Sequence, residues 1–146
     1  MMMPTSRSDS WVFVDTGAFF ALSFTGDENH RAARSIYERL TAERRQLVTT
    51  NFVLAETHAL LLNRLNRTIA LRVLESIVQS STRIVRVTAS DERLAREILK
   101  RYRDKDFSLT DATSFVVMER LGIGTAFAFD RHFAQYGLTL LSPLRQ

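Results

Sequence analysis

Four carboxylates stand where their surroundings do not favour a charge: Asp15, Glu56, Asp111 and Asp130. Asp15 and Asp130 each close a short apolar run, Asp111 follows the letters SLT, and Glu56 sits within the largely apolar NFVLAETHALLL. Several acids that converge on one small space repel one another unless a cation neutralises them. Oxygen ligands without cysteine suit hard cations such as Mg²⁺ or Mn²⁺. If the fold brings the four acids together, they would form a divalent-metal site.

Each acid also has a purely structural explanation. Asp15 could form an Asx turn or cap a helix, and Asp130 could cap a short helix over RHFAQY. The spacing Ser108-x-x-Asp111 fits a relaxed capping box, which need not exclude metal binding by the same carboxylate. Glu56 could lie on a solvent stripe, but its helix is apolar nearly all round, and a buried carboxylate is costly unless it is paired or holds a metal.

The histidines add little to this pattern. His30 and His58 lie in helical contexts that are typical of surface or packing residues. His132 follows Asp130 by two positions and is close enough to reach the same site, although a lone histidine has many structural uses. The sequence shows no Ser-His-Asp pattern and no glycine-rich phosphate loop.

Short apolar runs alternate with longer helical patterns along the chain, which predicts strands that alternate with helices. The expected strands are 11–15, 46–50, 83–87 and 125–130, with a candidate edge strand at 138–142. The expected helices are 30–45, 51–65, 68–80, 90–103 and 108–122. The alternation indicates an α/β fold: a three-layer α/β/α sandwich around a central parallel sheet of 4–5 strands.

The strand order decides whether the acids meet. In an open parallel sheet the strand ends and the following helix starts share one edge, where ligands bind at the topological switch point. With the order 3-2-1-4-5, the first and fourth strands are neighbours, so Asp15 and Asp130 would lie side by side. Asp111 at one helix start and Glu56 early in another helix would approach the same edge.

Length and composition are those of one globular domain, with 146 residues, 45% hydrophobic and 25% charged. The absence of cysteine excludes disulfides, cysteine-based zinc sites and cysteine nucleophiles. The sequence has no secretory signal and no apolar run of about 18 residues, which predicts a cytoplasmic protein with no membrane partner. We expect residues 1–10 to be a disordered leader and residues 11–146 to be a single domain.

The net charge of +4 is carried almost wholly by arginine, since Lys100 and Lys105 are the only lysines. Arginine suits bidentate contacts to phosphate, so a nucleic-acid partner is plausible. An arginine-biased genome and a solvated surface explain the same charge, because net charge says little about a particular function.

The motifs around the four acids resemble those of the PIN-domain ribonuclease family, in order and at similar spacing over nearly the whole chain. VFVDTGAFFAL resembles the family's first motif, with Asp15, and TTNFVLAETHALL its second, with Glu56. DKDFSLTDATSFVVMERLGI resembles the third, with Asp111 and the polar Ser108 and Ser114. AFAFDRHFAQYGL resembles the last, with Asp130.

The resemblance implies a PIN-like domain over 11–146, bound Mg²⁺ or Mn²⁺, and cleavage of single-stranded or structured RNA. Many stand-alone bacterial members of this size are toxins of the VapC type. The resemblance therefore also implies a small antitoxin partner and a homodimer.

The implied roles of the site residues follow from the same resemblance. Asp15, Asp111 and Asp130 would hold the metal, and Glu56 would coordinate through water or orient the attacking water. Thr16 would support the site with its hydroxyl. Arg131 is a candidate phosphate contact, with a solvated surface arginine as the alternative.

Two other function classes stay open at this point. An aspartyl-phosphate phosphatase would carry a second aspartate two positions after the first, where this chain has Gly17. A receiver-type phosphotransfer domain would need a lysine after a late strand, and neither lysine is so placed. A PIN-like RNA-binding or scaffold domain without catalysis would typically have lost acids, and this chain keeps all four.

Overall fold

The computed structural model describes residues 10–142. The strands are β1 (Trp11–Val14), β2 (Gln46–Thr50), β3 (Arg83–Val85), β4 (Thr125–Phe127) and β5 (Thr139–Leu140). The helices are α2 (Thr16–Ser23), α3 (His30–Ala42), α4 (Asn51–Arg64), α5 (Arg67–Gln79), α6 (Ala89–Arg101), α7 (Leu109–Leu121) and α8 (His132–Tyr136). The predicted leader, apart from Ser10, and the last four residues of the predicted domain lie outside the described residues, so these boundaries stay predictions.

The five strands form one sheet in the order β3-β2-β1-β4-β5, and every pairing is parallel. Strand β1 is central, with Phe13 paired to Val48 of β2 on one side and to Ala126 of β4 on the other. The predicted strand order is therefore confirmed. The continuous apolar run in β1 follows from this place, because a central parallel strand is buried on both faces.

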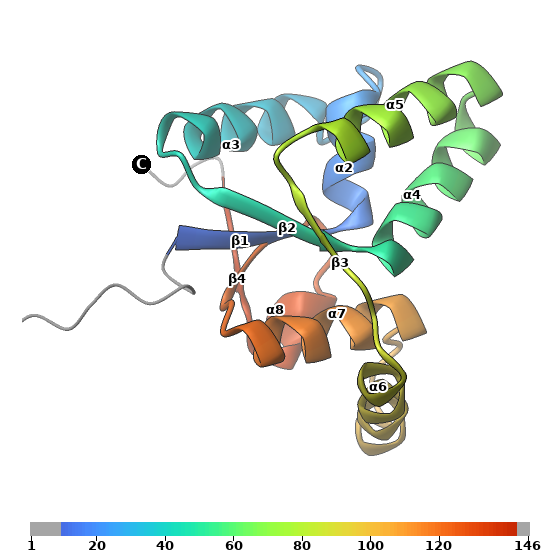
Figure 1. The fold of residues 1–146 in the computed structure, drawn as a ribbon, viewed down its shortest axis with the longest axis vertical. Coiled ribbons are helices and arrows are strands. Elements are labelled where there is room, and N and C mark those ends of the chain that lie inside the picture. The colour runs from blue at the N-terminus through green and yellow to red at the C-terminus, as the bar shows by residue number, and fades with distance from the viewer. Residues whose placement is uncertain (1–9, 143–146) are drawn as a thin grey trace, which may run out of the picture.

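Helices cover both faces of the sheet (Figure 1). Helices α2, α3 and α5 lie on one face, while α7 and α8 lie on the other, with α6 packed against α7. Helix α4 packs against α5 and α2 and also contacts α7. The predicted three-layer sandwich is confirmed. Within residues 10–142, none of the helices has both the length and the apolar character that a membrane crossing requires.

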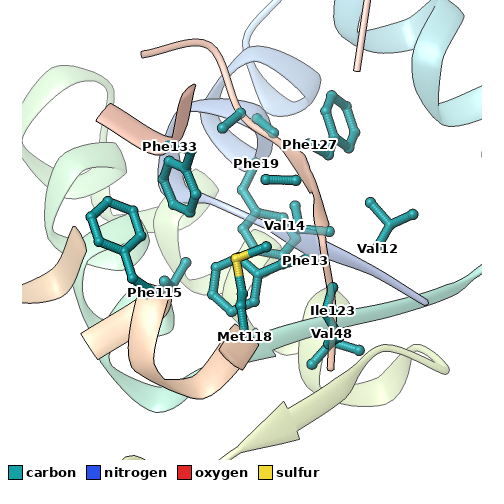
Figure 2. Close-up of a cluster of buried hydrophobic side chains, with 14 of the residues drawn as sticks. Val12, Phe13, Val14, Phe19, Val48, Phe115, Met118, Ile123, Phe127 and Phe133 are labelled. Carbon is teal, nitrogen blue, oxygen red and sulfur yellow. The ribbon is translucent and has the colours of Figure 1, made fainter. Parts of the chain in front are cut away.

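The hydrophobic core surrounds β1 and fixes the end of that strand. Phe13 is fully buried and packs against Phe133, at 6.1 Å between ring centroids. Phe133 in turn meets Phe115 edge to face at 5.1 Å (Figure 2). Burying one such side chain stabilises the fold by roughly 1.5–3 kcal/mol. The strand end that leads into Asp15 is thus anchored by packing against α7 and α8.

Helix α2 begins directly after Asp15 and is absent from the predicted elements. Its sequence TGAFFALS has no polar face, so it lacks the periodicity that reveals an amphipathic helix. A helix that is apolar on all sides is stable when it is buried, and Ala18, Phe19 and Phe20 are buried here. The chain therefore turns from the strand into the helix without an intervening loop.

Several element ends differ from the predicted ones. Helices α5 and α6 each begin one position before the predicted starts at 68 and 90. Asn66 caps α5, and Thr88 caps α6 because it forms a complete capping box with the residue three positions later. Strand β4 ends at Phe127, so the prediction of a strand up to Asp130 is wrong. Asp130 follows in the turn that leads to α8.

Candidate active site

The four predicted acids lie around one open cleft at the carboxyl edge of the sheet. The cleft has a volume of about 410 Å³ and is lined by Asp15, Thr16, Gly17, Glu56, Leu60, Ser108, Asp111, Asp130 and His132. Four separate parts of the chain supply the acids: the β1–α2 junction, helix α4, the first turn of α7 and the β4–α8 turn. The fold thus assembles residues that are more than a hundred positions apart in sequence.

Asp15 is buried, and its side chain does not cap the helix that follows it. Only 4% of the residue is exposed, and although it precedes α2, its side chain makes no capping hydrogen bond. The buried Oδ1 atom has no hydrogen-bond partner among the described residues. Leaving a buried polar atom unsatisfied costs about 1–3 kcal/mol. The turn or cap that the sequence also allowed is therefore not what holds this carboxylate in place.

The pKa of Asp15 reflects its surroundings. Burial, followed by the nearby carboxylate of Asp130, raises the pKa of Asp15 to about 8, against the lowering effect of the Thr16 backbone N–H. The carboxylates of Asp111 and Glu56 make smaller contributions to the same rise in pKa. A bound cation would favour the charged form of each of these groups.

Asp111 combines a helix cap with an open ligand position. Its backbone N–H donates to Ser108 Oγ at 3.0 Å, and its Oδ2 accepts from the Ser108 backbone N–H at 3.0 Å. His132 Nδ1 lies 2.7 Å from the same Oδ2 atom. Every hydrogen bond that the described residues make to this side chain ends on Oδ2, which leaves Oδ1 free for another ligand. Capping and metal binding can therefore use different oxygens of one carboxylate.

Asp130 lies beside Asp111 at the start of α8. Its Oδ1 accepts a hydrogen bond of 2.9 Å from the His132 backbone N–H, but the N-cap of α8 is Arg131, so Asp130 does not cap this helix. Burial and the neighbouring Asp111 carboxylate raise the pKa of Asp130, while the His132 N–H lowers it. Ligand atoms of Asp111, Asp130 and His132 all lie within 4.8 Å of one another. The carboxylates of Asp111 and Asp130 therefore lie close enough to share one cation, with the His132 ring beside them.

Glu56 reaches the cleft from a solvent-exposed position, so the expectation that it is buried is wrong. Helix α4 buries only Val53, Thr57 and Leu61, which form a narrow stripe along one side. Glu56 lies next to this stripe and accepts a hydrogen bond of 2.6 Å from Thr16 Oγ1. Its carboxylate is held by this contact and not by enclosure.

The remaining predicted polar residues divide between the cleft and other places. Thr16 and Ser108 line the cleft, and the Ser108 hydroxyl oxygen accepts the capping bond of α7. Ser114 is fully buried and donates to the Thr110 carbonyl within α7. Arg131 lies outside the cleft, in an adjoining hollow of about 440 Å³ that it shares with Lys105, Gln135 and others.

The cleft fits a hard divalent cation. Its ligand atoms are carboxylate oxygens. Asp15 Oδ1 is buried without a hydrogen-bond partner among the described residues, and Asp111 Oδ1 is open because the capping bond ends on Oδ2. Mg²⁺ and Mn²⁺ prefer such oxygen ligands.

The site residue that the sequence indicated most weakly is His132, which contacts two of the acids. Its signal was its place two positions after Asp130.

Comparison with known proteins agrees with this geometry. The PIN domain family matches residues 12–138. The 23S rRNA-specific endonuclease VapC20 of Mycobacterium tuberculosis is 38% identical over 133 residues, which cover 90% of this chain and 98% of the relative. The VapC ribonuclease of Archaeoglobus fulgidus is 33% identical over 124 residues, which cover 83% of this chain and 78% of that protein.

The solved structures include a close match. The crystal structure of Mycobacterium tuberculosis VapC20, a sarcin-ricin loop cleaving toxin, superposes with a TM-score of 0.83 at 36% sequence identity. The alignment covers 90% of this chain and 99% of that one. The PIN domain match over residues 12–138 includes every residue that lines the acidic cleft. The chain therefore belongs to the PIN-domain family and, within it, is related to the VapC ribonucleases.

Proposed function

We propose that this chain is a divalent-metal-dependent ribonuclease that hydrolyses RNA phosphodiester bonds at the acidic cleft. The observation that carries the proposal is Asp15, whose buried Oδ1 has no hydrogen-bond partner among the described residues and whose pKa is raised by burial and by the acids around it. Such a group is costly to keep unless it binds a cation. The family membership supports the same reaction.

We assign the metal ligands to Asp15, Asp111 and Asp130. When bound, Mg²⁺ or Mn²⁺ neutralises charge on the phosphoryl group and lowers the pKa of a coordinated water. Asp15 offers its unpartnered Oδ1, and Asp111 offers the oxygen that its capping box leaves open. The rigid ends of β1 and α7 position these two residues, so little side-chain ordering is required when the cation binds.

Glu56 and Thr16 act together on the attacking water. Thr16 Oγ1 donates to Glu56 Oε1 and thereby orients the carboxylate. The second oxygen, Oε2, is left to accept a hydrogen bond from the water. Because Glu56 is exposed, this contact requires no rearrangement of α4.

Arg131 and Lys105 offer contacts for the phosphates that flank the scissile bond. Both line the hollow that adjoins Asp130. A guanidinium group can bind a phosphate through two hydrogen bonds. The excess of positive charge in the chain favours a polyanion such as RNA over cationic or uncharged substrates.

The biological role that we infer is that of a toxin in a type II toxin–antitoxin system. VapC20, which is 36% identical in the structural alignment, is a toxin that cleaves the sarcin-ricin loop. A ribonuclease of this kind acts on RNA of the cytoplasm, where a small antitoxin protein would restrain it. We also propose that the chain forms a homodimer.

The decisive experiment is an RNA cleavage assay with the purified chain and its Asp15→Asn variant. The substrates are a mixed RNA pool and 23S rRNA, because a 38% identical relative is specific for 23S rRNA. We expect cleavage with Mn²⁺ or Mg²⁺, none with EDTA, and none by Asp15→Asn although this variant folds. Undiminished cleavage by Asp15→Asn would refute the assignment. RNA binding without cleavage by the wild type would indicate a scaffold domain.

A further inference from the structure

His132 contacts two of the four acids through different atoms. Its backbone N–H donates to Asp130 Oδ1 at 2.9 Å, and its ring Nδ1 lies 2.7 Å from Asp111 Oδ2. Since a carboxylate accepts hydrogen bonds, this second contact requires the proton on Nδ1. A nitrogen that donates in this way has no lone pair for a cation. His132 thus connects two metal ligands without using Nδ1 as a ligand itself.

A second capping box in the chain shows what this contact does. Asp91 at the start of α6 makes the same reciprocal bonds with Thr88 that Asp111 makes with Ser108. The outside partner of Asp91 is Arg120, which binds Oδ1 through Nε at 3.0 Å and Oδ2 through Nη2 at 2.7 Å. The forked guanidinium therefore occupies both oxygens of that carboxylate, and the Asp91 site is a closed ion pair.

The imidazole at Asp111 has the opposite effect. A ring N–H is a single donor, and it binds Oδ2, the oxygen that already accepts the Ser108 N–H. Two donors on one oxygen fix the carboxylate plane while the other oxygen stays open. Asp91 is thus closed by the two donors of Arg120, whereas Asp111 keeps one oxygen open because its partner outside the capping box, His132, donates only once.

The imidazole is itself held in place. Its ring meets the edge of Phe107 at 5.5 Å, with an angle of 79° between the planes. Its backbone is tied to Asp130 at the first position of α8. The donor is therefore positioned before any cation binds, and it need not lose further freedom when one does.

We propose that His132 is the positioning residue of this site: it fixes the Asp111 carboxylate so that Oδ1 faces the cation and links that carboxylate to Asp130. The inference rests on the proposed metal-dependent function and deepens it. Partners outside the ligand shell typically change metal affinity by 10–100-fold. We therefore expect the effect on metal affinity to exceed any effect on folding.

The test is a calorimetric titration of the metal-free protein with Mn²⁺. His132→Phe keeps a ring against Phe107 but has no donor, and we expect its affinity for Mn²⁺ to fall about tenfold or more. His132→Asn places an amide N–H where Nδ1 was, and we expect it to keep most of the affinity. His30→Phe is the control, because His30 Nδ1 contacts the Ala21 carbonyl and His30 does not line the cleft. Thermal melting of the metal-free variants checks that all of them fold.

A spectroscopic measurement separates positioning from direct ligation. Electron spin echo modulation of bound Mn²⁺, with ¹⁵N-labelled histidine, is expected to show no directly coordinated histidine nitrogen. A coordinated nitrogen, or an unchanged Mn²⁺ affinity in His132→Phe, would overturn the positioning role while RNA cleavage by the wild type upheld the proposed function. If the wild type bound no Mn²⁺ and cleaved no RNA, both inferences would fall.

Discussion

Thr16 donates a 2.6 Å hydrogen bond to Glu56 and so joins the first residue of α2 to the second turn of α4, across forty positions of sequence. The two side chains come from helices α2 and α4, which pack against each other. Glu56 is exposed, so this bond is what limits its conformations at the cleft. The contact links the packing of two helices to the placement of one carboxylate.

The first prediction concerns this bond. Thr16→Val keeps the side-chain shape but removes the donor, so Glu56 is no longer oriented toward the water. We expect the rate of RNA cleavage to fall about tenfold, which corresponds to the loss of about 1.4 kcal/mol in the transition state. Thr16→Ser keeps the hydroxyl and should stay near the wild-type rate. Single-turnover cleavage measures both variants. Equal rates for Thr16→Val and Thr16→Ser would contradict the role of the Thr16 hydroxyl in orienting Glu56.

The second prediction concerns the metal. A cation that binds only the folded chain stabilises it by about 2.7 kcal/mol at a hundredfold excess over Kd. For a chain of this size, that should raise Tm by about 5–10 °C. We expect this shift with Mn²⁺ or Mg²⁺ in the wild type and its loss in Asp111→Asn. Differential scanning calorimetry with and without EDTA makes the comparison, and a full shift in Asp111→Asn would argue against that ligand.

The third prediction uses the pH dependence of the metal-free protein. The folded-state pKa of Asp15 is about 8, above the ordinary value of 3.8. Between these values the folded state binds more protons than the unfolded state, so the free energy of unfolding falls as pH rises. The contribution of Asp15 to the free energy of unfolding is fully present below about pH 4. It is lost as pH rises through 8, a change on the order of a few kcal/mol.

Urea denaturation in EDTA at several pH values tests this dependence. Asp15→Asn cannot ionise at that position, so we expect a clearly smaller fall in stability between pH 5 and 8.5 than in the wild type. Mg²⁺ should restore wild-type stability at high pH, because it favours the charged carboxylate. An identical pH dependence in wild type and variant would show that Asp15 is not the group responsible.

The fourth prediction compares the two capping boxes. Asp91→Asn weakens the ion pair with Arg120, and because Asp91 is only 2% exposed, we expect a loss of stability of about 2 kcal/mol. Its Mn²⁺ affinity should stay unchanged, since Asp91 is outside the cleft. Asp111→Asn should show the reverse: lost Mn²⁺ affinity with a smaller change in stability. Calorimetric titration and thermal melting measured together distinguish the two, and a loss of Mn²⁺ affinity in Asp91→Asn would contradict the contrast.

The sequence alone determined the fold class and the four acids, because continuous apolar runs, helix caps and acids at element ends are local signals. The strand order was predicted as an arrangement that makes Asp15 and Asp130 neighbours, and the structure confirms the parallel sheet in that order. Asp15 and Asp111 could be placed at the cleft because β1 and the capping box of α7 are both visible in the sequence. Helix α2 could not be predicted, because a buried helix with no polar face has no helical periodicity.

Tertiary packing alone decided how each acid is used. Glu56 was expected to be buried, yet α4 buries a different stripe and leaves Glu56 exposed, because burial depends on which side of a helix its neighbours cover. Asp91 and Asp111 begin their helices with equivalent capping boxes, and no local signal separates them. Arg120 reaches one and His132 the other only after distant elements pack together. Types and spacing of residues therefore indicated the chemistry, while long-range contacts decided which oxygen of each carboxylate stays open.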